Sequence, residues 1–192
     1  MTFRIHIISD THFNHKRIIA YENRPFDSVE EMNQTMINRW NEVVSDEDLV
    51  IHLGDFVFGG IHKIRAIHSQ LNGNMIIIKG NHDKWYRMNA VGINMYENLK
   101  IGHLFLTHEP TRVDDGLVNV HGHIHSKRSW FGINASVERT NYYPRLIEHY
   151  FKEAKKILKR RGWNEGNIEE GGYRTAKNKE SKNKTGGISK RL

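Results

Sequence analysis

The sequence predicts a layered α/β fold, and two features of the chain carry this prediction. Short apolar runs that are typical of buried strands alternate with segments of helical periodicity over residues 3–79. Further strand-like runs follow one another from residue 101, before a last helical segment. The length of 192 residues suits one domain that is large enough to bury a core.

The first half of the chain contains three predicted strands and two predicted helices. Residues 3–8, 49–53 and 75–79 are short apolar runs and are expected to be strands. Ser28 is expected to begin a helix, because Glu31 stands three residues later and completes a capping box. Apolar residues at helical spacing predict a second helix over residues 61–71, which an Asn-Gly turn connects to the next strand.

The second half contains mainly strands. Residues 101–107, 117–120 and 130–137 are expected to be strands. Pro144 suits the first turn of a last helix, and Gly162 is expected to end that helix.

Polar residues that can bind metal ions follow several of these strands in five blocks. Asp10 and His12 follow the first strand, Asp55 follows the second, and the run Gly-Asn-His-Asp at 80–83 follows the third. His108 and the run Gly-His-Ile-His at 122–125 follow strands of the second half. Because each block stands where a strand passes into a loop, all five are expected to converge on one edge of the sheet core.

Carboxylates, an amide and imidazoles gathered in this way predict a site for two metal ions. Two divalent ions about 3.5–4 Å apart can convert a bound water to hydroxide near neutral pH. A bridging anion must hold two cations that close, and Asp55 is expected to be this bridge. Asp10 and His12 are two residues apart, as are His123 and His125, so in an extended segment each pair would face one ion. Ligands without sulfur suit Mn, Fe, Zn, Ni or Co.

The order of the blocks, Asp-x-His, Gly-Asp, Gly-Asn-His-Asp, His and Gly-His-x-His, resembles that of the calcineurin-like metallophosphoesterases. The resemblance covers roughly residues 1–145, and the short chain is most similar to the compact bacterial and phage-type members. It implies a sandwich of two central mixed β-sheets flanked by helices. It also implies a hydrolase that cleaves phosphoric esters by attack of a hydroxide that bridges two metal ions.

The resemblance implies a role for each position of the blocks. One ion would be held by Asp10, His12, Asp55 and His125, and the other by Asp55, Asn81, His108 and His123. His82 would face the phosphate and protonate the leaving oxygen, and Asp83 would orient the His82 ring. Mn is the metal expected first, with Fe, Ni, Zn or Co as alternatives.

The residues around the metal blocks are expected to select the substrate. Asn14 and His15 follow the first block closely and could reach the substrate, and Arg24 or Arg112 could clamp a phosphate oxygen. Short loops and a basic C-terminal region favour a phosphodiesterase that acts on a nucleotide or nucleic acid. A phosphomonoesterase or protein phosphatase at the same site stays open, as does a non-catalytic scaffold that binds nucleic acid or protein.

Charge divides the chain into two regions. Residues 152–192 hold 13 Lys and Arg against 5 Glu, whereas the preceding residues are nearly neutral. We expect a metallophosphoesterase domain at 1–163 and a basic, flexible tail at 164–192 that could contact nucleic acid. The chain has no cysteine and no apolar run near the roughly 20 residues of a membrane span, so a cytoplasmic protein is expected. The sequence does not predict an oligomeric state.

Overall fold

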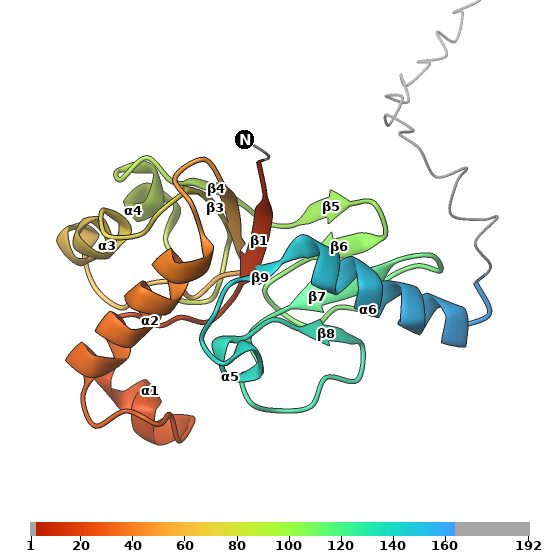
Figure 1. The fold of residues 1–192 in the computed structure, drawn as a ribbon, viewed down its shortest axis with the longest axis horizontal. Coiled ribbons are helices and arrows are strands. Elements are labelled where there is room, and N and C mark those ends of the chain that lie inside the picture. Colours follow the sequence, from red (N-terminus) through yellow and green to blue (C-terminus); the bar gives the residue numbers. More distant parts are fainter. Residues whose placement is uncertain (1–2, 164–192) are drawn as a thin grey trace, which may run out of the picture.

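The computed structural model describes residues 3–163 as two β-sheets with helices packed around them (Figure 1). The first sheet has five strands in the order β4-β3-β2-β1-β9, and the second has four in the order β5-β6-β7-β8. The strands are β1 (Ile5–Ile8), β2 (Leu49–His52), β3 (Asn74–Ile78), β4 (Asn94–Tyr96), β5 (Leu99–Ile101), β6 (Leu104–Leu106), β7 (Val118–His121), β8 (Gly132–Asn134) and β9 (Arg145–Leu146). Both sheets mix parallel and antiparallel pairs, which confirms the predicted fold. The predicted tail at 164–192 lies outside the described residues.

The helices are α1 (Lys16–Tyr21), α2 (Val29–Val43), α3 (Ile61–His68), α4 (Trp85–Asn89), α5 (Val137–Thr140) and α6 (Ile147–Arg160). The start of α2 is as predicted, because the Ser28 Oγ accepts a hydrogen bond from the Glu31 N–H at 3.1 Å. The Glu31 carboxylate accepts from the Asp27 N–H at 2.7 Å, one residue before its usual capping-box partner. Within the part of the chain that the structure describes, none of the helices is long and apolar enough to cross a membrane.

Helices α1 to α4 cover one face of the first sheet and form the first apolar core with it. Met32, Met36 and Trp40 of α2 are buried there. They pack in one cluster with Val50 of β2 and Ile77 of β3. The helical spacing of these α2 residues therefore marks the face that is removed from water, as predicted.

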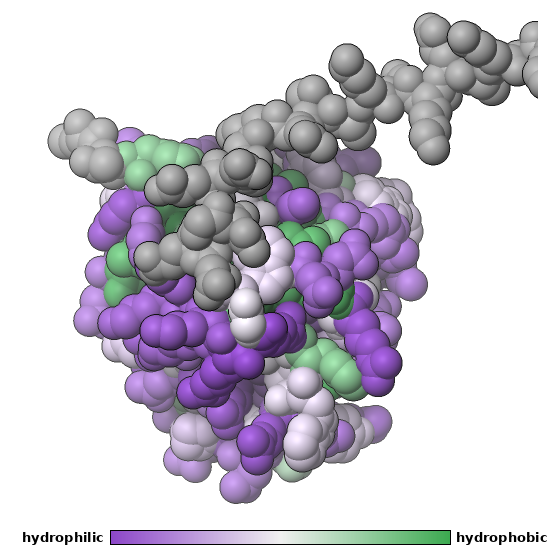
Figure 2. All heavy atoms as spheres, turned by 90° about the vertical axis from the view of Figure 1, so that its right-hand side faces the viewer, coloured by the Kyte–Doolittle hydropathy of each residue, from purple (hydrophilic) through white to green (hydrophobic). Residues whose placement is uncertain are grey.

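The second apolar core joins the two sheets and α6. Ile51 of β2, Leu106 of β6 and Val120 of β7 lie in it together with Tyr150 and Leu158 of α6. Helix α6 lies across the second sheet and reaches β1 and β9 of the first (Figure 1). The side of the molecule at which α6 ends in Figure 1 is predominantly hydrophilic where it is coloured in Figure 2.

Parallel pairing brings the metal-binding blocks together. Strands β1, β2 and β3 run parallel, so the loops that follow them leave the first sheet at one edge. Strands β6, β7 and β8 are also parallel, and the loops after β6 and β7 carry the remaining blocks. The Asp10 N–H donates to the Gly54 carbonyl at 3.0 Å, and the Gly122 N–H donates to the His108 carbonyl at 2.9 Å. In each sheet, hydrogen bonds thus connect the polar loops that follow the carboxyl ends of neighbouring parallel strands.

Three predictions for the second half were wrong in detail. Residues 101–107 do not form one strand, because the chain turns at Gly102, with φ of +54°, between β5 and β6. Residues 130–137 contain only the short strand β8, since α5 begins at Val137. Pro144 does not lie in the first turn of α6, which begins at Ile147 after β9.

Candidate metal centre

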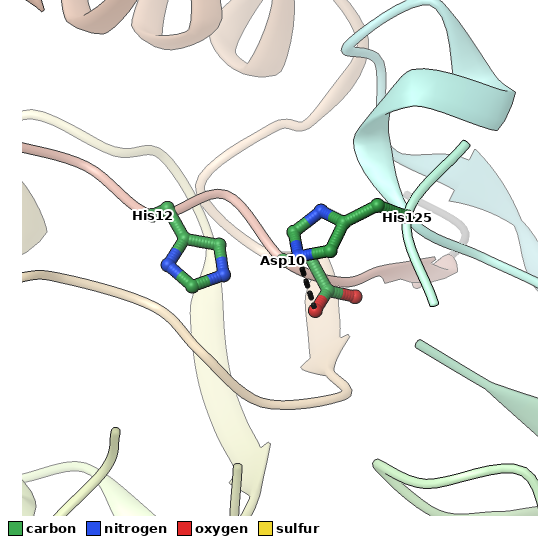
Figure 3. Close-up of side chains that lie close together, drawn as sticks. All are labelled: Asp10, His12 and His125. Carbon is green, nitrogen blue, oxygen red and sulfur yellow. Dashed lines mark ion pairs between the residues drawn. The ribbon is translucent and has the colours of Figure 1, made fainter. Parts of the chain in front are cut away.

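Two overlapping groups of metal-binding side chains meet beyond the ends of β1 and β2. Donor atoms of Asp10, His12 and His125 lie within 4.8 Å of one another, and so do those of Asp10, Asp55 and His108. Figure 3 shows the His12 and His125 rings side by side, with the Asp10 carboxylate directed at the His125 ring. The ring centroids are 5.1 Å apart, and His125 Nε2 lies 3.9 Å from Asp10 Oδ1. Asp10 belongs to both groups, so the two groups are adjacent.

The Asp55 carboxylate is the point on which imidazoles from separate loops converge. Its Oδ2 atom lies 3.4 Å from His12 Nε2, 3.6 Å from His108 Nε2 and 3.9 Å from His82 Nε2. Its Oδ1 atom accepts a hydrogen bond from the His82 backbone N–H at 2.9 Å, which fixes the carboxylate. One oxygen that faces imidazoles from three loops occupies the position expected of a bridging ligand.

His123 and Asn81 join this set to different degrees. His123 Nδ1 lies 3.3 Å from His108 Nε2, and its backbone N–H donates to both Asp10 carboxylate oxygens at 3.1 and 3.0 Å. Asn81 lies in the exposed turn after β3 and borders a groove of about 760 Å³ that His108 also lines. Among the contacts of the described residues, none joins the Asn81 amide to another predicted ligand.

The chemistry of His12 and Asp10 fits a bound cation. His12 Nε2 is buried and makes no hydrogen bond within the described part of the chain, although it faces Asp55. Burial lowers the pKa of His12 and raises the pKa of Asp10, because it disfavours the charged form of each group. A divalent ion held here would accept the free imidazole lone pair of His12 and would stabilise the ionised Asp10 carboxylate. The donor set therefore suits divalent metals that take nitrogen and oxygen ligands.

Comparison of the sequence with known families decides the classification. The family described as Calcineurin-like phosphoesterase matches residues 3–183. The chain belongs to this family. It is 42% identical over 159 residues to the uncharacterized protein MJ1445 of Methanocaldococcus jannaschii, and this match covers 73% of the chain and 85% of that protein. The Gene 66 protein of Mycobacterium phage L5 is 39% identical over 85 residues, which cover 42% of this chain and 40% of the phage protein.

A solved structure has the same fold as this calcineurin-like phosphoesterase. The crystal structure of AQ665, a protein of unknown function from Aquifex aeolicus, matches with a TM-score of 0.65 and 25% sequence identity. The match covers 79% of this chain and 99% of that one. The resemblance that the order of the polar blocks predicted is thereby confirmed.

Five of the seven predicted ligands of this calcineurin-like phosphoesterase are presented by left-handed backbone and not by extended chain. Asp10, His12, Asp55, His123 and His125 have φ angles between +48° and +68°. Asp and His adopt this region several times more often than most residues. The expectation that extended geometry directs each i, i+2 pair to one ion was therefore wrong. Asp10 and His12 do share a group, but His123 lies beside His108 and His125 lies beside Asp10.

Two glycines allow the loops of the centre to touch. Gly54 has φ of +98°, and a Cβ atom there would lie 2.6 Å from His108 Nδ1. A Cβ atom on Gly80 would collide with the backbone nitrogen and carboxylate of Asp55. The glycines of the Gly-Asp and Gly-Asn-His-Asp blocks are thus required by the close approach of two backbones.

Sequence analysis missed a buried ion pair beneath the centre. The Arg24 guanidinium donates to Glu138 Oε1 at 2.7 Å, to the Asp10 carbonyl at 2.8 Å and to the Thr11 carbonyl at 2.9 Å. Glu138 Oε1 lies in turn 3.1 Å from His125 Nδ1. The expectation that Arg24 could clamp a phosphate was wrong, because its side chain is 0% exposed. A lone Arg in a polar segment carries no sequence signal for burial, and Glu138 follows a segment predicted as a strand.

The Glu138 contact determines how His125 presents its ring. Burial by itself lowers the pKa of His125, but the hydrogen bond to Glu138 and the Asp10 charge outweigh burial and raise it. Burial by itself raises the pKa of Glu138, but the His125 hydrogen bond and the Arg24 charge lower it. When Nδ1 donates to Glu138, Nε2 is the nitrogen that faces Asp10. A carboxylate behind a ligand imidazole orients the ring in this way and increases its basicity.

Asp83 holds backbone amides and not the His82 ring. Its Oδ2 accepts from the Asp55 N–H at 2.7 Å and the Gly80 N–H at 3.0 Å, and its Oδ1 accepts from the Phe56 N–H at 3.3 Å. The His82 side chain is 50% exposed and is not among the contacts of Asp83 in the described residues. These contacts give Asp83 a role in fixing the two loops that carry Asp55 and Asn81.

The three predicted substrate contacts lie in different environments. The Asn14 side chain accepts from the Asn33 amide at 2.8 Å, so its oxygen is already engaged. His15 is stacked on Phe58 with ring centroids 4.5 Å apart, and its centroid is 6.4 Å from that of His82. Arg112 is exposed, with its guanidinium 5.1 Å from the centre of the Phe131 ring. Contact of these residues with substrate stays a prediction.

Proposed function

We propose that this calcineurin-like phosphoesterase is a dinuclear-metal phosphodiesterase that acts on nucleotide-type substrates. The family and the candidate ligands support a metal-dependent hydrolase of phosphoric esters. The observation that carries a two-metal centre is the Asp55 carboxylate, whose Oδ2 faces His12 and His108 from different loops at 3.4 and 3.6 Å. The open space beside this centre supports the preference for diesters.

The proposed ligands divide between two ions. One ion would be held by Asp10, His12, Asp55 and His125, and the other by Asp55, Asn81, His108 and His123. Bound together, such ions supply a water acidic enough to act as a nucleophile near neutral pH and neutralise charge that develops on the phosphate. Mn²⁺ is our first choice for a mixed set of oxygen and nitrogen ligands, before Fe, Ni, Zn or Co.

His82 is the proposed proton donor to the leaving oxygen. Its side chain is 50% exposed, whereas those of His12 and His108 are 4% and 3% exposed. Its Nε2 atom nevertheless lies 3.9 Å from Asp55 Oδ2, so the ring stands at the solvent side of the centre. A titratable ring in this position can reach an ester oxygen that approaches from solution.

An open groove supports the preference for diesters. The groove of about 760 Å³ extends from His108 and Asn81 to Trp85 and Tyr86 at the start of α4. A diester carries a substituent on each side of the phosphate, and an open groove leaves room for both. Trp85 and Tyr86 are 40% and 63% exposed, so their rings offer surfaces on which a base can stack.

The test is hydrolysis of a matched pair of aryl phosphates, one diester and one monoester, by metal-stripped protein. Mn²⁺, Ni²⁺, Co²⁺, Zn²⁺ or Mg²⁺ is added back in separate reactions, with Asp55→Asn as the inactive control. We expect Mn²⁺ to restore turnover and kcat/KM to be higher for the diester. Faster monoester turnover would show a phosphomonoesterase, and no turnover despite metal binding would contradict catalysis.

A further inference from the structure

Two loops leave the metal centre at ligand positions. One loop comprises residues 109–116 and directly follows His108. The other comprises residues 126–131, directly follows His125 and leads to β8. Arg112 and Trp130 come four and five residues after these ligands, so their Cα atoms lie within about 14 Å and 18 Å of the ligand Cα atoms. A ligand bound to these side chains therefore lies close enough to the centre for a neighbouring part of the same molecule to reach it.

These loops expose aromatic rings that are paired with guanidinium groups. Trp130 is 79% exposed and Phe131 is 41% exposed. The Arg128 guanidinium lies 5.1 Å from the centre of the Trp130 ring, and the Arg112 guanidinium lies 5.1 Å from that of the Phe131 ring. Adjacent exposed rings with cations beside them offer flat faces for bases and positive charge for phosphates.

The charge on this surface is suited to an anion. Residues 126–131 include Lys127 and Arg128 and contain no acidic residue. The other loop contains three acidic residues, Glu109, Asp114 and Asp115, but its Arg112 side chain lies over Phe131 of the basic loop. Each ring thus has a guanidinium group over it, and Lys127 adds a third positive charge to the loop that carries both rings.

Hydrogen bonds hold both loops to the second sheet. The Ser129 Oγ lies 2.6 Å from His121 Nε2, and the Asn134 amide donates to the His125 and Lys127 carbonyls at 2.7 and 3.2 Å. The Thr111 N–H donates to the Asn119 side chain of β7 at 2.9 Å. Both loops are therefore anchored to β7, the strand that precedes His125, and the loop that carries the rings is also anchored to β8.

We propose that these two loops bind single-stranded nucleic acid and deliver one of its phosphodiester groups to the metal centre. Trp130 and Phe131 stack on bases, and Arg112, Lys127 and Arg128 contact phosphates. This inference rests on the proposed function and names its substrate class as a polymer and not a mononucleotide. The faces of a nucleic-acid base are free to stack on a side chain only when the strand is unpaired. We therefore do not expect these loops to bind duplex.

Binding of a fluorescently labelled single-stranded oligouridylate, measured by anisotropy with the full chain and Mn²⁺, tests the inference. Trp130→Ala is expected to raise Kd by about 5- to 150-fold, the range that loss of one stacked base produces. Arg112→Gln and Arg128→Gln are each expected to lower the slope of log Kd against log salt by about 0.7. Phe3→Ala removes another exposed ring, 56% exposed and located before β1, and is expected to leave Kd unchanged.

The outcomes separate this inference from the proposed function. Equal Kd values for Trp130→Ala and Phe3→Ala, or equal affinity for a duplex of the same sequence, would overturn the inference. Hydrolysis of an aryl diester without any oligouridylate binding would overturn it and leave the proposed function standing. If the variants change oligouridylate binding as expected but no diester is hydrolysed, the result would support nucleic-acid binding by the two loops and overturn the proposed function.

Discussion

Arg24 Nη2 and Glu138 Oε1 lie 2.7 Å apart in a pair whose side chains are 0% and 6% exposed. The same guanidinium holds the Asp10 carbonyl, and the same carboxylate contacts the His125 ring. One ion pair therefore links the loop after β1 to the loop after β7. Arg24 and Glu138 thereby hold the proposed ligands Asp10 and His125 in place.

We expect Arg24→Lys to lower metal affinity by about 10- to 100-fold, the usual effect of losing a group that orients ligands. Lysine keeps the charge but cannot reach Glu138 and the carbonyls of Asp10 and Thr11 together. Arg39→Lys is the matched control, because Arg39 also lies over the Tyr142 ring but donates to an exposed carbonyl. Calorimetric titration with Mn²⁺ measures the metal affinity of both variants. Equal affinities would show that the Arg24 contacts do not contribute to metal binding.

Asp83→Asn is expected to destabilise the protein by about 1–3 kcal/mol, because one of the backbone N–H groups would face an amide NH₂ instead of an acceptor. Chemical denaturation of the metal-free protein measures this loss. If Asp83 instead orients His82, as the sequence predicted, the free energy of unfolding would stay unchanged. In that case the pH profile of kcat would shift.

His82→Ala is expected to lower kcat by about 10²- to 10⁴-fold while metal binding and the free energy of unfolding are unchanged. The ring is half exposed, so little packing is lost. The loss should be largest for esters with basic leaving groups, because these need a proton most. His149→Ala, at an exposed position of α6, is the control. Equal losses for good and poor leaving groups would argue against proton donation.

His52 is expected to make stability depend on pH. Burial lowers its pKa to about 3, helped by the nearby His108. Its Nδ1 accepts from the Gly54 N–H at 3.2 Å, and its Nε2 lies 3.0 Å from Thr11 Oγ1, so the neutral ring satisfies both contacts. Below the unfolded pKa of about 6.5 the unfolded chain binds the extra proton. Stability present above that pH is therefore lost as pH falls toward 3, by up to about 1.4 kcal/mol per pH unit.

The measurement for His52 is the free energy of unfolding of metal-free protein from pH 7 to pH 4. His52→Asn keeps an acceptor for the Gly54 amide but has no titratable ring. Other groups titrate in both proteins, so the difference between the two curves reports His52. Parallel curves would mean that His52 does not bind the proton on unfolding.

The strand and helix patterns of the sequence predicted the long elements well and the short ones poorly. Helix α2 has enough turns for Met32, Met36 and Trp40 to show its period, and Ser28 marks its start. Helices α1, α4 and α5 and strand β4 have three to six residues, too few for any period to emerge.

The site was predictable to the extent that its chemistry is local in sequence. Asp10, His12 and Asp55 stand next to strands and next to glycine or polar turns, so their convergence followed from the order of the blocks. Glu138 could not be found in this way, because its contact with His125 depends on where α5 packs. The partners of Asp83 are backbone amides, which every residue except proline offers and which no pattern of side chains reveals.

The proposed ligands of the centre come from both sheets. Asp10, His12 and Asp55 follow strands of the first, and His108, His123 and His125 follow strands of the second. Neither half of the chain alone carries the complete set of ligands proposed for either ion. Full metal affinity can arise only after the two halves have docked, so the free energy of binding adds to the free energy of docking. Loading of metal would then be a late event in folding, and only a correctly assembled molecule would acquire its catalytic ions.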